Sequence, residues 1–239
     1  MNLVAHSGLI TVMQRAARKA APRLRRDFGE VELLQVSRKG PADFVSLADK
    51  RAEQTLLEEL RHARPDWGFL MEEAGVIEGD PAKPRWVIDP IDGTSNFLHG
   101  IPHFAISIAV EEPRGGGWRG DITQALVYQP LTDESFWAER GRGAWHNERR
   151  LRVSSRRDLA DTLIATGVPY KAHGDLPRFT RILEAVSPEV AGILLVREAG
   201  GFVTDFRGGD RALELGQVLA ANDQIHSRLH KLVGGALRK

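Results

Sequence analysis

The sequence predicts a single domain of the α+β or layered α/β class over residues 1–239. Stretches with apolar residues at helical spacing alternate with short apolar runs typical of buried strands, and this alternation indicates a mixed fold. Glycines and prolines punctuate these stretches, and no repeat or low-complexity tract interrupts them. The domain is expected to have two approximate halves, residues 1–150 and a shorter α/β half at 151–239.

Composition excludes several classes of function. With 33 Lys+Arg against 32 Asp+Glu, the formal net charge is +1, so no global field attracts nucleic acid or a membrane surface. The chain has no Cys, which excludes disulfides, thiolate zinc sites and a Cys nucleophile. No apolar run could cross a bilayer, and residues 1–10 do not resemble a signal peptide. We therefore expect a cytoplasmic protein without membrane or nucleic-acid partners.

The first third of the chain predicts two helices separated by a strand. Apolar residues at helical spacing between Leu3 and Leu24 predict a helix that ends near Asp27, with a basic opposite face best interpreted as solvated. Residues 31–36 favour a strand. Ser46 to Asp49 resemble a capping box, which predicts a second helix from there to just before Pro65.

The middle of the chain predicts a series of strands. Apolar runs bounded by turn residues favour strands at 68–71, 86–88, 104–110, 125–128 and 135–138, with turns at 115–117 and 141–143. The last third predicts a strand at 163–166 and a helix from near Asp175. A second helix is predicted to start at Ser187 and to end at Gly200–Gly201. Strands at 202–206 and 217–221 and a final helix at 224–233 follow.

The most informative stretch runs from Trp86 to Phe97 and reads W-V-I-D-P-I-D-G-T-S-N-F. A buried strand ends in one carboxylate, Asp89, after which Pro90 would stop the ladder of strand pairing. A second carboxylate follows at Asp92. Gly93 then permits a tight turn, and the next residues open a short helix.

This arrangement has a chemical rationale. Mg²⁺ prefers hard oxygen ligands, which Asp89, the carbonyl of Ile91 and Asp92 can supply from the end of a rigid strand. Backbone amides of Gly93 and of Thr94 and Ser95 would face an incoming phosphate at the helix start. A pair of Mg²⁺ ions would polarise the phosphate and activate water.

Three further carboxylates lie upstream. Glu73 closes the strand at 68–71 and can join the same site, whereas Glu72 is interpreted as its solvated neighbour. Asp49 is open to two interpretations, as a residue of the site or as part of the capping box. His226 and His230, four residues apart, lack an apparent third ligand and are interpreted as solvated.

These motifs resemble the inositol monophosphatase family. The segment 86–97 matches the family signature W-x-(I/V)-D-P-(I/L)-D-G-T-x-N-(F/Y) throughout. Residues 43–49 with Glu53 resemble an earlier family element, and 71–73 resemble its Gly-Glu-Glu element with Met in place of Gly. The resemblance covers nearly the whole chain.

The resemblance implies a five-layer αβαβα sandwich, a homodimer, and Mg²⁺-dependent hydrolysis of a small phosphomonoester such as an inositol or sugar phosphate. It implies that Mg²⁺ is bound by Glu73, Asp89, the Ile91 carbonyl and Asp92. It implies phosphate binding by Gly93, Thr94 and Ser95. Asp49, Thr94 and Glu73 would be the catalytic residues, with Asp49 and Thr94 orienting the attacking water.

One departure from the family pattern predicts an incomplete site. Members carry Trp-Asp-x-Ala-Ala-Gly, whose Asp binds metal and faces substrate. Aligned on Ala191-Gly192, the Trp and Asp positions are Ser187 and Pro188 here, so the segment before them is predicted to be absent and the second half of the sandwich to be incomplete. Our hypothesis is that Glu189 partly replaces the missing carboxylate.

Two alternatives remain open at this stage. The chain could hydrolyse another phosphate ester, as a nucleotide 3′-phosphatase or a fructose-1,6-bisphosphatase does. It could instead be a catalytically weak family member that acts as a binding or regulatory protein.

Overall fold

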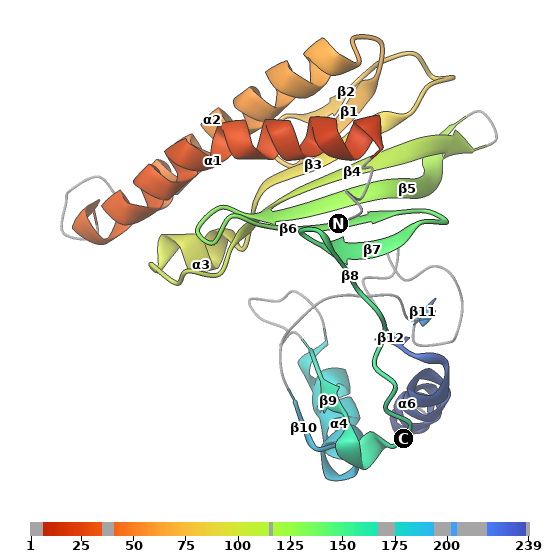
Figure 1. The fold of residues 1–239 in the computed structure, drawn as a ribbon. Coiled ribbons are helices and arrows are strands. Elements are labelled where there is room, and N and C mark those ends of the chain that lie inside the picture. Colours follow the sequence, from red (N-terminus) through yellow and green to blue (C-terminus); the bar gives the residue numbers. More distant parts are fainter. Residues whose placement is uncertain are drawn as a thin grey trace. The chain divides into compact units, whose positions relative to one another are not determined.

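The protein is described by a computed structural model, whose fold Figure 1 shows. The chain forms two compact units, residues 1–150 and residues 151–239. Each is described by itself below. The structure describes residues 7–34, 41–114, 117–166, 175–193, 202–204 and 219–237.

The first unit opens with a helix that is longer than the sequence predicts. Helix α1 spans Gly8–Leu34, with Pro22 inside it. The predicted strand at 31–36 is therefore wrong for residues 31–34, and residues 35 and 36 lie outside the described part. Val31 is buried and continues the apolar stripe of Leu24 along the helix. A short apolar run can belong to a helix face as well as to a strand, and here the helix prevails.

The second helix begins earlier than the sequence predicts. Helix α2 spans Pro41–Ala63, so the predicted capping box at Ser46 to Asp49 is wrong and Asp49 lies inside the helix. Pro41 provides the actual start, because proline suits the first turn of a helix, where its missing N–H has no partner to lose. The predicted end before Pro65 is confirmed.

An eight-stranded sheet forms the other layer of the first unit, in the order β2-β1-β3-β4-β5-β6-β7-β8. β1 is parallel to β3, and all other neighbours are antiparallel. The strands are β1 Gly68–Met71, β2 Gly75–Ile77, β3 Arg85–Asp92, β4 Ala105–Arg114, β5 Gly117–Gln129, β6 Glu134–Glu139, β7 Gly143–His146 and β8 Arg149–Arg150.

The five strands predicted between residues 68 and 138 are confirmed, although several are longer than predicted. β5 differs most, because it begins at Gly117 instead of near residue 125. β3 continues through Pro90 to Asp92 instead of stopping at the proline. Its pairing with β4 shifts register between Asp89 and Asp92, as expected where a proline cannot donate to the ladder. This irregularity turns the end of the strand toward the short helix α3, Thr94–Leu98.

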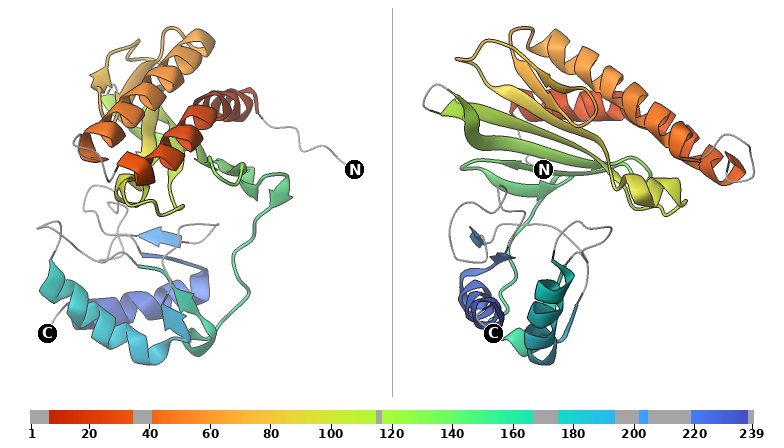
Figure 2. Two further views of the ribbon diagram at one scale, coloured as in Figure 1. Left: turned by 90° about the vertical axis from the view of Figure 1, so that its left-hand side faces the viewer. Right: turned by 180° about the vertical axis from the view of Figure 1, so that it is seen from behind.

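Helices α1 and α2 lie side by side over one face of the sheet (Figures 1 and 2). α2 packs on β3, and α1 packs on β5. Alternate strand residues face the helices and are fully buried, among them Trp86, Ile106 and Leu126. Burial of apolar area at about 25 cal/mol per Å² is the main favourable contribution to such a core. The core therefore fixes α2 against β3, the two elements that carry Asp49 and Asp89.

The second unit has a separate and smaller described core, made of Leu159, Val186, Leu219, Ile225, Leu229 and Val233. Its elements are a 3₁₀ turn at Leu159–Asp161, β9 Leu163–Ile164, α4 Leu176–Val186, a 3₁₀ turn at Ser187–Glu189, β10 Gly192–Ile193, β11 Phe202–Thr204, β12 Leu219–Ala221 and α6 Asp223–Ala236.

Most predictions for this unit are confirmed. The Asp175 side chain caps α4 by accepting a hydrogen bond from the Arg178 amide. The predicted helix starting at Ser187 is wrong, because Ser187–Glu189 is only a 3₁₀ turn that extends α4, and the chain then enters β10. Its predicted end at 200–201 lies outside the described residues.

Candidate active site

Two carboxylates meet where the parallel strands β1 and β3 end. Met71 pairs with Ile88, so the next residues, Glu72 and Asp89, emerge side by side. The Glu72 amide donates to the Ile88 carbonyl at 3.2 Å, and the Asp89 side chain is hydrogen-bonded to that of Glu72. Two carboxyl groups can share such a bond only if one of them holds a proton. Two acidic side chains therefore lie next to each other at the ends of β1 and β3.

Burial and neighbouring negative charge raise the pKa of Asp89 to about 7. Burial is the larger cause, followed by the Glu72 carboxylate and then Asp92, while the Ile91 amide acts in the opposite direction. That amide donates to Asp89 Oδ1 at 3.1 Å. Without a cation, this carboxyl group therefore loses its proton with difficulty at neutral pH.

Asp49 brings a third acidic side chain from α2. It is only 3% exposed. Burial raises its pKa to about 7, with smaller contributions from Glu73, Glu72 and Glu53. Its Oδ1 atom is buried without a hydrogen-bond partner among the described residues. A buried oxygen of this kind normally has a donor or a cation beside it.

Glu53 lies one turn after Asp49 on α2 and is also buried. Its carboxylate accepts hydrogen bonds from the amides of Glu73 and Ala74, in the turn between β1 and β2. The turn that carries Glu72 and Glu73 is thereby tied to the helix that carries Asp49.

Gly93 links the end of β3 to α3 and cannot be replaced without strain. Its φ of 95° lies in the left-handed region, and an added Cβ would come within 2.9 Å of the His103 carbonyl oxygen. The Thr94 hydroxyl donates to the Ile91 carbonyl at 3.0 Å. Asn96 donates to the His103 carbonyl at 2.7 Å and holds the following loop. The first amides of α3 have no partner within the helix.

The structure brings together most of the residues that the sequence singles out. Asp49, Glu73, Asp89 and Asp92 all belong to one interacting acidic group, and Gly93 starts α3 directly after it. Glu72, which the sequence indicated as a solvated neighbour, is exposed, and it also interacts with Asp89. The parallel register of 68–71 with 85–88 was the signal that could have identified this contact, because the first residue after each strand meets the other. Glu189 is exposed on its 3₁₀ turn in the second unit.

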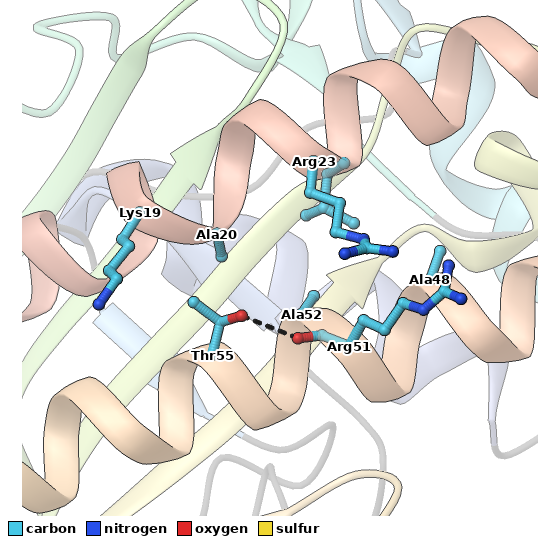
Figure 3. A pocket seen from close by; sticks show the side chains of 8 residues that line it. Lys19, Ala20, Arg23, Ala48, Arg51, Ala52 and Thr55 are labelled. Carbon is cyan, nitrogen blue, oxygen red and sulfur yellow. Dashed lines mark hydrogen bonds between the residues drawn. The ribbon is translucent and has the colours of Figure 1, made fainter.

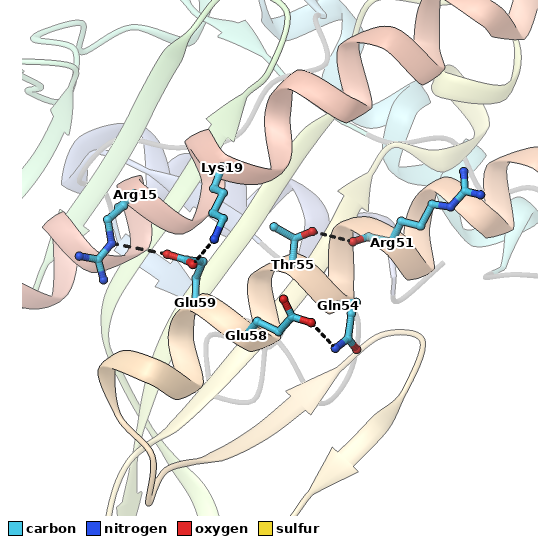
Figure 4. A network of polar contacts seen from close by, with 7 residues as sticks. All are labelled: Arg15, Lys19, Arg51, Gln54, Thr55, Glu58 and Glu59. Atoms are coloured by element: carbon cyan, nitrogen blue, oxygen red, sulfur yellow. Dashed lines mark hydrogen bonds and ion pairs between the residues drawn. The ribbon is translucent and has the colours of Figure 1, made fainter.

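The basic face of α1 is mostly matched by acceptors of the chain itself. Arg15 and Lys19 both pair with Glu59 of α2 (Figure 4), Arg18 pairs with Asp133, and Arg25 donates to the Pro130 carbonyl. These contacts agree with the prediction of a solvated face rather than a nucleic-acid patch.

A hollow of about 220 Å³ lies between α1 and α2 (Figure 3). Lys19, Arg23 and Arg51 line it together with Thr55, and the carboxylates of the acidic group do not. It is therefore separate from the candidate site.

The acidic group offers only oxygen atoms, which defines a class of site suited to hard cations. Comparisons with known proteins agree with this class. The model of the inositol monophosphatase family matches residues 6–190. The chain is 44% identical to the inositol-1-monophosphatase of Rhizobium meliloti (strain 1021), an alignment that covers 96% of this chain and 97% of the relative. It is 35% identical to the Nus factor SuhB of Pseudomonas aeruginosa over 92% of this chain and 94% of the relative.

The solved structure of the extragenic suppressor protein SuhB from Bartonella henselae superposes with a TM-score of 0.80 at 41% identity, covering 95% of this chain and 98% of that one. The chain belongs to the inositol monophosphatase family. It has that family's α/β fold over about 95% of its length. Family membership makes it a phosphomonoesterase-type protein with metal-dependent catalysis.

The chain is shorter than the relatives that it resembles. The alignment with the Rhizobium relative runs over 265 positions, more than the 239 residues of this chain, so the relative has residues without a counterpart here. The family match ends at residue 190, beside the junction before Ala191. A missing part of the second half stays a prediction. None of the described helices is long and apolar enough to cross a membrane.

The donor set fits a divalent cation, although the side chains would have to adjust around it. Among the described residues, no three His, Asp or Glu side chains converge as a bound metal requires. The unpartnered oxygen of Asp49 and the carboxyl oxygens of Asp89 and Glu72 nevertheless provide the kind of ligand that a hard cation prefers. A cation between these carboxylates would replace the shared proton and remove their mutual repulsion.

Proposed function

We propose that the chain hydrolyses a small phosphomonoester of the inositol or sugar phosphate class with the help of Mg²⁺. The observation that carries this proposal is the acidic group, in which the buried Asp49 and the half-buried Asp89 both have pKa values raised to about 7. Such a group is costly to keep unless a cation or proton balances it. Membership of the family supplies the reaction class.

The residues of this chain would act as follows. Asp89, Asp92, the Ile91 carbonyl and the two glutamates after β1 would hold the Mg²⁺ ions, with Glu72 added to the predicted Glu73. When bound, Mg²⁺ supplies polarisation of the phosphate and acidification of water.

The amides of Gly93, Thr94 and Ser95 would bind phosphate oxygens at the start of α3. The Thr94 hydroxyl gives its hydrogen to the Ile91 carbonyl, so its oxygen is free to accept one from the attacking water. Asp49, whose Oδ1 lacks a partner among the described residues, would accept the other. Together these two residues would orient the water.

Turnover of D-myo-inositol 1-phosphate with and without Mg²⁺ tests the proposal. We expect phosphate release that depends on Mg²⁺, and a loss of about 100-fold or more in Asp89→Asn, because a ligand then loses its charge. Asp80→Asn is the matched control, since Asp80 lies outside the acidic group and pairs with Lys83. Equal rates in Asp89→Asn and wild type would overturn the proposed role of the site.

A substrate panel separates the alternatives within the same reaction class. Inositol and sugar monophosphates are expected to be the best substrates. A clear preference for a 3′-nucleotide or for fructose 1,6-bisphosphate would favour one of the other two phosphatase activities instead.

A second candidate is a binding or regulatory role with little catalysis. It is favoured by the relatives that are named Nus factors and by the segment that the sequence predicts to be absent. Absence of turnover on the whole panel, together with retained Mg²⁺ binding, would support this role. We also propose a homodimer, which light scattering of the purified protein would detect as twice the 26.5 kDa chain mass.

A further inference from the structure

We propose that Glu53 is a positioning residue that anchors the turn carrying Glu72 and Glu73 to α2. It would thereby set the distance between these two carboxylates and Asp49. The inference rests on the proposed function, since the importance of that distance follows from cation binding. The anchoring itself can be tested without any metal.

The contacts of Glu53 are directed at the turn. Its Oε1 accepts from the Glu73 amide at 3.0 Å and from the Ala74 amide at 3.3 Å, and its Oε2 accepts from the Ala74 amide at 3.1 Å. The side chain is 4% exposed. A buried carboxylate bonded by successive amides is a strong, charge-assisted arrangement with defined geometry.

The turn has few other means of holding its shape. β1 and β2 are joined by only three residues, Glu72 to Ala74, and all three are exposed. Gly75 follows in the left-handed region, with a φ of 73°. The carboxylate of Glu53 is therefore the contact that ties the tip of this connection to α2.

The negative charge of Glu53 is costly at this position, next to other carboxylates. None of the ion pairs among the described residues involves Glu53. Its negative charge moreover contributes to the raised pKa of Asp49, so it adds repulsion to a group that is already acidic. A glutamine side chain would avoid this cost, but its single acceptor oxygen could not also make the bond of 3.1 Å that Oε2 makes with the Ala74 amide. The two-oxygen geometry explains why a carboxylate is suited to the position.

Glu53 acts through its neighbours rather than on a cation. Both of its oxygens are directed at backbone amides. Asp49 and Glu53 are four residues apart and share one face of α2. One turn of α2 thus carries two carboxylates with different roles. Asp49 belongs to the acidic group, and Glu53 binds the backbone of the turn that carries Glu72 and Glu73.

Amide hydrogen exchange on the full-length, metal-free protein tests the anchoring. In the wild type we expect the Glu73 and Ala74 amides to be protected although both residues are exposed. We expect exchange at these two positions to be at least about 10-fold faster in Glu53→Ala and intermediate in Glu53→Gln, which keeps one acceptor oxygen. Glu58→Gln is the matched control, because Glu58 lies on the same helix, is exposed and bonds only Gln54 among the described residues.

Binding of Mn²⁺, followed by the electron paramagnetic resonance signal of the free ion, tests the consequence for the site. We expect the affinity to weaken about 10-fold or more in Glu53→Ala and less in Glu53→Gln, with no change in Glu58→Gln. Unprotected Glu73 and Ala74 amides in the wild type would overturn the inference even if the variants failed to fold. Faster exchange with unchanged Mn²⁺ affinity would overturn it as well. A wild type that binds no Mn²⁺ but shows the exchange pattern would instead refute the proposed function.

Discussion

Asp49 and Asp89 make the stability of the metal-free protein depend on pH. Both have folded-state pKa values of about 7, above the ordinary value of 3.8. Between about pH 4 and pH 7 the folded protein therefore binds more protons at these sites than the unfolded chain, so stability falls as pH rises through this window. Below pH 4 and above pH 7 these two groups add no further slope.

We expect thermal unfolding in EDTA to show a lower midpoint at pH 8 than at pH 5, and Asp49→Asn to reduce this difference. The amide of asparagine does not titrate, so the contribution of Asp49 disappears. Addition of Mg²⁺ should raise the midpoint more at pH 8 than at pH 5, because it binds the ionised form. Parallel pH curves for wild type and Asp49→Asn would contradict the assignment.

Gly93 is a second residue at which a single substitution has a defined cost. Gly93→Ala combines a left-handed φ with a contact of 2.9 Å to a backbone oxygen. We expect a loss of about 3 kcal/mol in the free energy of unfolding, measured with urea. Gly141→Ala is the control, since Gly141 has a φ of 77° but nothing near its Cβ. It should lose only about 1 kcal/mol. Equal losses would show that the contact with His103 relaxes.

At the scale of elements, α2 links the hydrophobic core to the acidic group. Leu56 is fully buried on this helix, whereas Leu47 is 49% exposed. Leu56→Ala should destabilise the first unit by about 3 kcal/mol because it leaves a cavity, and Leu47→Ala by about 0.5 kcal/mol. Urea unfolding followed by tryptophan fluorescence measures both. Similar losses would contradict the packing of α2 described here.

Elements were predictable where local signals decide them. The strands of the first unit were found because apolar runs are bounded by glycine, proline and polar turns. The end of α1 was missed because Val31 fits a helix stripe as well as a strand. The start of α2 was missed because Ser46 and Asp49 imitate a cap whose role depends on the preceding residues. The contact of Glu72 with Asp89 was not predicted because it is set by a parallel pairing between distant segments.

The residues that carry the candidate site were predictable for a different reason. Asp89, Asp92 and Gly93 lie in one short motif, so their proximity follows from the local chain. Asp49 and Glu73 come from separate segments, and the resemblance to a family indicated them. The role of Glu53 could not be read from either source, because it depends on backbone amides that the sequence does not display.

At the scale of the whole molecule, the two units have separate cores, and this should be visible in unfolding. All five tryptophans, residues 67, 86, 118, 137 and 145, belong to the first unit. The described second core contains only six buried side chains, so we expect the second unit to be less stable. Helical circular dichroism should therefore begin to fall at a lower urea concentration than tryptophan fluorescence changes. Coincident transitions would mean that the units unfold as one.

Every member of the acidic group, and the glycine that starts α3, comes from positions 49–93. A change of chain length after residue 150 therefore leaves these carboxylates in the sequence, and it affects only the metal-binding Asp that the family pattern places before Ala191. In an evolving lineage, such a division lets the second unit change while the acidic scaffold of the first unit stays constant.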